Sequence, residues 1–229
     1  MSFIVKNTTI PSILDLIAPH SCRGCGRIGA PLCNRCKKYI LDAHYNFCPK
    51  CKNLTSNGHC PNCHNLPPTF VVAERSGLID TLIHIYKYSS VRALAHPLAE
   101  ILAASLPQID TPVIIVPLPT INRHIRARGF DHMGKIAHQL AHIHPNFKVE
   151  NLLLREGNSV QVGANKTKRQ SQAQKAYKVN PKITIDKTAT YLLVDDVWTT
   201  GASMESAVKK LQQAGVSRIM IGLLAVSRI

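Results

Sequence analysis

Acidic residues are scarce in this sequence of 229 residues. It contains 13 Asp and Glu against 28 Lys and Arg, a formal net charge of +15, and no acidic residue occurs from Gly157 to Ile185. An excess of positive charge favours polyanionic partners: nucleic acid, phosphorylated small molecules or an anionic membrane surface. The chain stays basic even if all its cysteines bind metal as thiolates.

Long apolar runs are also missing. No segment approaches the roughly 18 uninterrupted apolar residues of a membrane-spanning helix. The first 19 residues are interrupted by Lys6, Asp15 and two prolines and lack a small-residue cleavage pattern, so they do not fit a signal peptide. We expect a cytoplasmic protein without an integral membrane segment, and leave peripheral association with the inner membrane open.

Cysteine is absent from the last 166 residues, whereas all eight cysteines lie between residues 22 and 63. This change in composition predicts a small N-terminal zinc-binding module over residues 1–66 and a second domain over residues 67–229. The segment HNLPPTF (64–70), with its paired prolines, fits a linker.

The cysteines form four C-x-x-C pairs. One tight turn can present both sulfurs of a pair to a tetrahedral ion, so four pairs supply two structural zinc sites with four cysteine ligands each. Cytosolic thiols stay reduced, and four pairs within 42 residues do not fit a redox motif. Sequential and crossed combinations of the pairs both make two sites, and we favour the sequential one. The pairs are Cys22/Cys25, Cys33/Cys36, Cys48/Cys51 and Cys60/Cys63.

Basic residues flank these pairs. Such flanks accompany zinc modules that bind nucleic acid and, about as often, modules that dock proteins, so both partners stay open. The flanking cations are Lys6, Arg23, Arg27, Arg35, Lys37, Lys38, Lys50 and Lys52.

Beyond residue 67, short apolar runs alternate with amphipathic segments. This alternation predicts an α/β domain with a parallel sheet that helices cover on both faces. We expect strands at 70–73, 113–119, 149–154, 191–194 and 219–226, and helices at 77–86, 92–106, 131–143 and 204–215.

A phosphate-binding pattern follows the apolar strand at 191–194. Asp195 and Asp196 sit at the carboxyl end of that strand, where carboxylates can accept hydrogen bonds from ribose hydroxyls. The segment 199–203 then opens a helix, whose free N–H groups and dipole favour a phosphate. The alternative is an ordinary helix capped by Thr200 or Ser203. The position directly after a buried strand favours a ribose 5-phosphate site.

This stretch resembles the PRPP-binding loop of type I phosphoribosyltransferases. More narrowly, the chain resembles the ComF/GntX family of competence-associated proteins over nearly its full length. The shared features are the cysteine pairs, VPLP…RARGFDH (116–132), the basic stretch with Gln161 and Arg169, and VDDVWTTGAS (194–203). Four positions depart from the family pattern: Asp131-His132 stands where Asn-Gln is expected, Gln172 replaces an Asn, and Trp198 is bulkier than usual.

The resemblance implies a phosphoribosyltransferase-type, Rossmann-like domain behind a double zinc ribbon. It implies that PRPP, with Mg²⁺ on its diphosphate, is bound by Asp195, Asp196, Thr199, Thr200, Gly201, Ala202 and Ser203. It places the diphosphate at Arg123, Arg126 and Arg128, where forked guanidinium groups could form a clamp, and near Lys87. A solvated basic surface is the alternative for the three arginines.

The basic stretch beyond Gly157 is expected to be a loop. It could close over the ligand, follow the phosphate backbone of single-stranded DNA, or bind nothing. Its candidate DNA-binding residues are Lys166, Lys168, Arg169 and Lys175.

Two functions follow from the resemblance and the charge. The first is a protein that handles single-stranded DNA during natural transformation and keeps a PRPP-type pocket. The second is an active phosphoribosyltransferase with an unidentified acceptor. A third hypothesis is a zinc scaffold that docks other competence or DNA-processing proteins. The fold alone does not decide among them.

Overall fold

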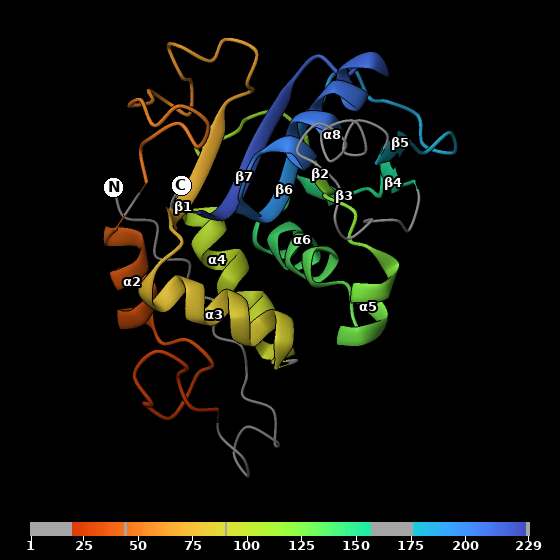
Figure 1. The fold of residues 1–229 in the computed structure, drawn as a ribbon. Coiled ribbons are helices and arrows are strands. Elements are labelled where there is room, and N and C mark those ends of the chain that lie inside the picture. The colour runs from red at the N-terminus through yellow and green to blue at the C-terminus, as the bar shows by residue number, and fades with distance from the viewer. Residues whose placement is uncertain (1–19, 44, 90, 157–175, 228–229) are drawn as a thin grey trace, which may run out of the picture.

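A five-stranded parallel sheet forms the centre of the computed structural model, which describes residues 20–43, 45–89, 91–156 and 176–227 (Figure 1). Its spatial order is β1-β7-β6-β2-β3, and every neighbouring pair is parallel. This confirms the expected parallel α/β fold. The strands are β1 (Thr69–Glu74), β2 (Val113–Pro117), β3 (Phe147–Val149), β6 (Thr190–Trp198) and β7 (Ile219–Val226).

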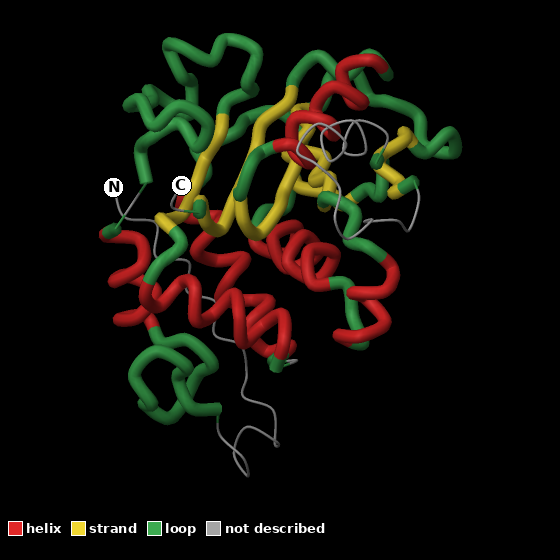
Figure 2. Tube along the Cα trace, viewed as in Figure 1, coloured by secondary structure: helices red, strands yellow, loops and turns green. Residues whose placement is uncertain are grey.

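Helices cover both faces of this sheet (Figure 2). Side chains alternate along a strand, so Leu192 and Val194 of β6 pack on one face while Tyr191 and Leu193 pack on the other. The first face carries α3 (Gly77–Tyr88), α4 (Ala95–Ser105) and α6 (His132–Ile143). The second carries α8 (Ala202–Gln213) and the antiparallel hairpin of β4 (Leu153–Arg155) and β5 (Tyr177–Val179).

The strand order reverses between β2 and β6. From β2 the chain continues to β3 on one side, whereas from β6 it continues to β7 on the other. Two strands at such a point leave a crevice beyond their carboxyl ends, where open α/β sheets bind ligands. Pro117 pairs with Val194 at this place, so the segments that follow β2 and β6 meet there.

Three features differ from the predicted elements. A single strand over 149–154 is wrong, because β3 ends at Val149 and β4 belongs to the separate hairpin. The strand expected at 191–194 continues to Trp198 as β6. The sequence also gives no sign of α5 (Asn122–Arg128), a short helix without a buried residue. Other elements agree closely, and β7 has the expected bounds.

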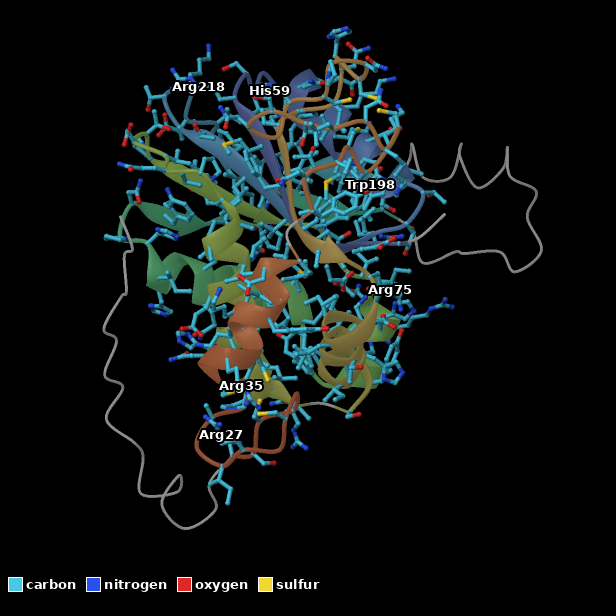
Figure 3. The ribbon with its side chains drawn as sticks, turned by 90° about the vertical axis from the view of Figure 1, so that its left-hand side faces the viewer. Arg27, Arg35, His59, Arg75, Trp198 and Arg218 are labelled. Carbon is cyan, nitrogen blue, oxygen red and sulfur yellow. The ribbon has the colours of Figure 1, made fainter. Side chains whose placement is uncertain are left out.

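The cysteine-rich segment lies along one side of the sheet domain. Its helix α2 (Asn34–Asp42) buries Cys36 and Ile40 in the same apolar cluster as α3 and α4. Lys37 of α2 also forms a 2.7 Å ion pair with Glu100 of α4. The loops before and after α2 lie at opposite ends of this side (Figures 1 and 3). The division at residues 66 and 67 stays a prediction.

Within the part of the chain that the structure describes, no helix combines the length and apolarity needed to cross a membrane.

Candidate functional site

The eight cysteines form two clusters, and the pairing is sequential. Within each cluster the four sulfurs lie within 4.8 Å of one another. Sulfur–sulfur distances of 3.7 Å (Cys25 to Cys33) and 3.4 Å (Cys51 to Cys60) resemble the roughly 3.8 Å between two thiolates on a tetrahedral zinc. The first cluster is Cys22, Cys25, Cys33 and Cys36, and the second is Cys48, Cys51, Cys60 and Cys63.

The surroundings of the sulfurs also fit thiolate ligands. The backbone N–H groups of Gly24 and Cys33 both point at Sγ of Cys22, at 3.4 Å. Such bonds are available because a C-x-x-C turn leaves its N–H groups free. The two four-cysteine clusters therefore offer two closed, structural zinc sites, with no position left for a substrate.

The second cluster is tied to the sheet domain by charge. Lys50, between Cys48 and Cys51, forms a 2.8 Å ion pair with Glu205 in the first turn of α8. Glu205 raises the pKa of Lys50 by hydrogen bond and charge. The N-terminal end of α8 is thus contacted by the second cysteine cluster as well as by the sheet.

The loop between β6 and α8 surrounds a small hollow. No side chain caps α8: its N-cap is Gly201, with φ of 77°. The first-turn N–H groups therefore remain free for an anion, and the alternative of capping by Thr200 or Ser203 is not adopted. The hollow measures about 140 Å³ and is lined by Asp195, Val197, Trp198, Thr199, Thr200, Gly201, Ala202, Ser203, Met204 and Leu223.

Gly201 is required at this turn for two reasons. Its positive φ disfavours any residue with a side chain. A Cβ atom there would also clash with Cζ2 of Trp198, a residue that is only 2% exposed. Trp198, which Figure 3 labels, therefore forms the floor against which the loop turns.

Asp195 and Asp196 lie on opposite faces of the sheet. Because β6 runs on to Trp198, both carboxylates lie within the strand, and the expectation that they follow its end is wrong. Asp195 is half-buried and lines the hollow on the α8 side. Asp196 is 6% exposed and points toward α3 and α6. The two carboxylates therefore have different neighbours and can have different roles.

Asp196 binds two side chains through one oxygen. Its Oδ2 lies 2.5 Å from Nζ of Lys87 and 2.6 Å from Nε2 of His132. Nδ1 of His132 in turn lies 3.0 Å from a terminal nitrogen of Arg128. A guanidinium only donates hydrogen bonds, so Nδ1 accepts and the proton on Nε2 is donated to Asp196.

These neighbours move the pKa values of the two carboxyls in opposite directions. Burial, reinforced by the charge of Asp196, raises the pKa of Asp195 to about 8. Burial also acts to raise the pKa of Asp196, but the hydrogen bond from His132 and the charge of Lys87 outweigh it and hold that pKa below its ordinary value. The negative charge of the pair is therefore held preferentially by Asp196.

The predicted diphosphate residues separate into two groups. Lys87 and Arg128 both belong to the network around Asp196. Arg123 and Arg126 are exposed on the same short helix, α5, and a clamp made of the three arginines stays a prediction. The four candidate DNA-binding residues, Lys166, Lys168, Arg169 and Lys175, lie outside the described residues.

Three residues at the site had no predicted role. His132 appears in the sequence only as a departure from the family pattern. Arg155, at the end of β4, lies 3.2 Å from the hydroxyl of Tyr177 and 3.4 Å from the carbonyl oxygen of Pro119. The Tyr177 hydroxyl also contacts Ser203, and the charge of Arg155 acts on Asp195. No spacing in the sequence marks Arg155 and Tyr177, because only the pairing of β4 with β5 brings these two residues together.

Comparison with known proteins gives a relative that aligns over most of the chain. No family model matches the chain. The chain is 24% identical to Competence protein F of Haemophilus influenzae over 207 residues, which cover 85% of this chain and 90% of that protein.

Among solved structures, the chain is similar to two hypoxanthine phosphoribosyltransferases. The enzyme from Staphylococcus aureus aligns with a TM-score of 0.36 and 11% identity, over 61% of this chain and 65% of that chain. The enzyme from Trypanosoma cruzi aligns with a TM-score of 0.39 and 12% identity, over 62% and 67%. The match thus spans about two thirds of each enzyme. Because both TM-scores are below 0.5, the parallel α/β fold is assigned from the observed strand order and not from these similarities.

The expected resemblance to competence-associated proteins is confirmed: over most of its length the chain is similar to Competence protein F, and it combines two four-cysteine clusters with a parallel-sheet α/β domain.

Proposed function

We propose that this chain is a competence-associated protein that handles single-stranded DNA during natural transformation and binds PRPP at the carboxyl edge of β6. One observation carries the PRPP proposal. At the point where the strand order reverses, Asp195 and the uncapped N-terminus of α8 line the same hollow. A ribose 5-phosphate needs this combination, since its hydroxyls require acceptors and its phosphate requires N–H donors.

Each part of PRPP has a group of suitable chemistry at this edge. The 5-phosphate would accept hydrogen bonds from the backbone of residues 199–203 and from their hydroxyl groups. Asp195 and Asp196 would accept hydrogen bonds from the ribose hydroxyls. Lys87 and Arg128 supply positive charge for the diphosphate, which brings Mg²⁺ with it as part of the ligand.

The DNA part of the proposal is supported by the relative's name and by charge. The chain carries a net charge of +15. Around the first cysteine cluster, Arg23, Arg27 and Arg35 are exposed, and Figure 3 shows Arg27 and Arg35 at that end of the molecule. Lys38 and Lys50 are instead paired with Asp42 and Glu205. The arginines, together with residues 166–175, are the proposed contacts to the phosphate backbone. Docking of other competence or DNA-processing proteins on the zinc module remains a further proposal.

An active phosphoribosyltransferase is the second candidate. Lys87 of α3 binds Asp196 directly and Arg128 of α5 is joined to it through His132, so cations from two helices would be available to a leaving diphosphate. In that reaction a nucleophilic acceptor would attack C1 of the ribose and diphosphate would leave with its bonding electrons. No segment for recognition of a nucleobase is identified, so the acceptor stays open.

Calorimetry on one preparation tests both parts. Titration with PRPP and Mg²⁺ should show saturable binding. Titration with single-stranded DNA should show affinity that falls steeply with salt, with a log–log slope of about −0.7 per phosphate contact. Charge reversal at Lys166, Lys168 and Arg169 should flatten that slope and spare PRPP binding. If the reversal instead abolishes PRPP turnover and leaves DNA affinity unchanged, the enzyme candidate replaces the DNA proposal for this segment.

A further inference from the structure

We propose that His132 is the positioning residue of this site, because it fixes the carboxylate of Asp196 and the guanidinium of Arg128 relative to each other. The groups that bind the ribose and the diphosphate of one ligand are thereby held at a fixed distance and orientation. The inference rests on the proposed function, because it assigns a role within the PRPP site. It concerns a residue that binds no ligand itself.

The imidazole is held from several sides. His132 is the first residue of α6 and is 5% exposed. Its Nε2 lies 2.6 Å from Asp196 of β6 and its Nδ1 lies 3.0 Å from Arg128 of α5. The hydroxyl of Tyr86 donates a 2.9 Å hydrogen bond to its backbone carbonyl. Thr120, just after β2, also approaches Nδ1 at 3.4 Å.

His132 therefore joins elements on both sides of the strand reversal. Asp196 belongs to β6, whereas Arg128 belongs to the connection that follows β2. Lys87 contacts the same oxygen of Asp196, but an ammonium is a point charge that sets no direction for the guanidinium. An imidazole is rigid and has one nitrogen for each partner, so it sets both positions at once.

Two substitutions separate the two contacts. In His132→Asn the side-chain amide lies near the place of Nδ1, so it can serve Arg128 but does not reach Asp196. In His132→Gln the amide reaches the place of Nε2, so it can donate to Asp196. Exposed His138 on the same helix offers a matched control, His138→Gln.

The probes are inorganic diphosphate and ribose 5-phosphate, titrated separately by calorimetry. We expect His132→Gln to weaken diphosphate binding by about tenfold and to retain ribose 5-phosphate, and His132→Asn to do the reverse. PRPP should bind more weakly to both variants and normally to His138→Gln. A residue that merely fills space would lower the affinities for both probes together.

The wild-type chain provides a test that needs no substitution. Long-range ¹H–¹⁵N spectra of histidine-labelled protein should show His132 with its proton on Nε2 and a bare Nδ1. A proton on Nδ1 overturns the inference and leaves the PRPP proposal standing. The inference is also overturned if folded His132→Asn and His132→Gln variants lose affinity for the two probes equally, or do not lose it at all. If wild-type chain binds neither PRPP nor the probes, the proposed function fails and this inference fails with it.

Discussion

The two four-cysteine clusters and the carboxyl edge of the sheet both gather reactive side chains, but they do so over different distances. Each cluster takes its four ligands from one short stretch, 22–36 or 48–63. The edge takes Lys87 from α3, Arg128 from α5, His132 from α6 and Asp196 from β6. The clusters are thus built by local turns, whereas the edge exists only once the sheet is assembled.

This difference determines which perturbation disrupts each site. A cluster depends on its metal, because short loops contain too little apolar surface to fold alone. The edge depends on the order of strands and on the satisfaction of buried charge. The two sites should therefore respond differently to metal loss and to substitution.

Loss of zinc should have the largest effect, and the two clusters should differ. We expect about two zinc ions per chain by elemental analysis, since each structural site contributes roughly 10–16 kcal/mol of apparent binding energy at neutral pH.

Cys22 and Cys36 pack in the main apolar cluster with α3 and α4. Calorimetry should therefore show a larger drop in Tm for Cys36→Ser than for Cys63→Ser. One zinc per chain, or equal drops, would contradict this comparison.

The two carboxylates should respond differently to removal. Asp196→Ala leaves Lys87 and His132 without their shared acceptor in a buried place, so we expect a loss of about 3–5 kcal/mol in the free energy of unfolding. Asp195→Ala, at the half-buried wall of the hollow, removes a carboxyl whose charged form is disfavoured by burial, so it should lower that free energy far less than Asp196→Ala does. Urea denaturation measures both, and equal losses would contradict their assignment to different faces.

The turn at Gly201 permits a controlled test of shape. Gly201 and Gly215 both have positive φ, so alanine at either position carries the roughly 1–2 kcal/mol penalty of the left-handed region. Only at Gly201 does the new Cβ meet Trp198; around Gly215 nothing lies within 4 Å. Gly201→Ala should therefore lose about 1–3 kcal/mol more than Gly215→Ala in urea denaturation. A similar loss in both variants would remove the argument for a close-packed loop.

The smallest effect concerns pH. Burial raises the pKa of Asp195 to about 8, so the folded chain keeps a proton that the unfolded chain releases near pH 4. Between pH 4 and pH 8 the folded state therefore binds more protons than the unfolded state. Asp195 thus makes the free energy of unfolding fall as the pH rises toward 8. From pH 7 to 8 we expect a loss of about 1 kcal/mol or less, absent in Asp195→Asn. Asp196, whose pKa is lowered, contributes stability that is lost on acidification. Thermal unfolding measured at a series of pH values would show both dependences of stability on pH.

The sequence predicts the features that depend on neighbours along the chain. The C-x-x-C spacing predicts two zinc sites, and apolar runs predict the strands of the sheet. Helix α5 escapes prediction because it buries no residue, so it has no apolar stripe. The contact of His132 with Asp196 joins residues 64 positions apart, and Arg155 reaches Tyr177 only through the hairpin. The assembled sheet creates the first contact, and the pairing of β4 with β5 creates the second.

Titration of PRPP and Mg²⁺ into wild-type protein and Asp195→Asn tests the central claim most directly. Asparagine keeps the size of the side chain and replaces one acceptor oxygen at the wall of the hollow with an amide N–H₂ donor. We expect saturable binding to the wild type, an affinity at least about tenfold lower in the variant, and a Tm of the variant that is no lower than that of the wild type. Equal affinity in both folded proteins, or no binding to the wild type, would contradict it.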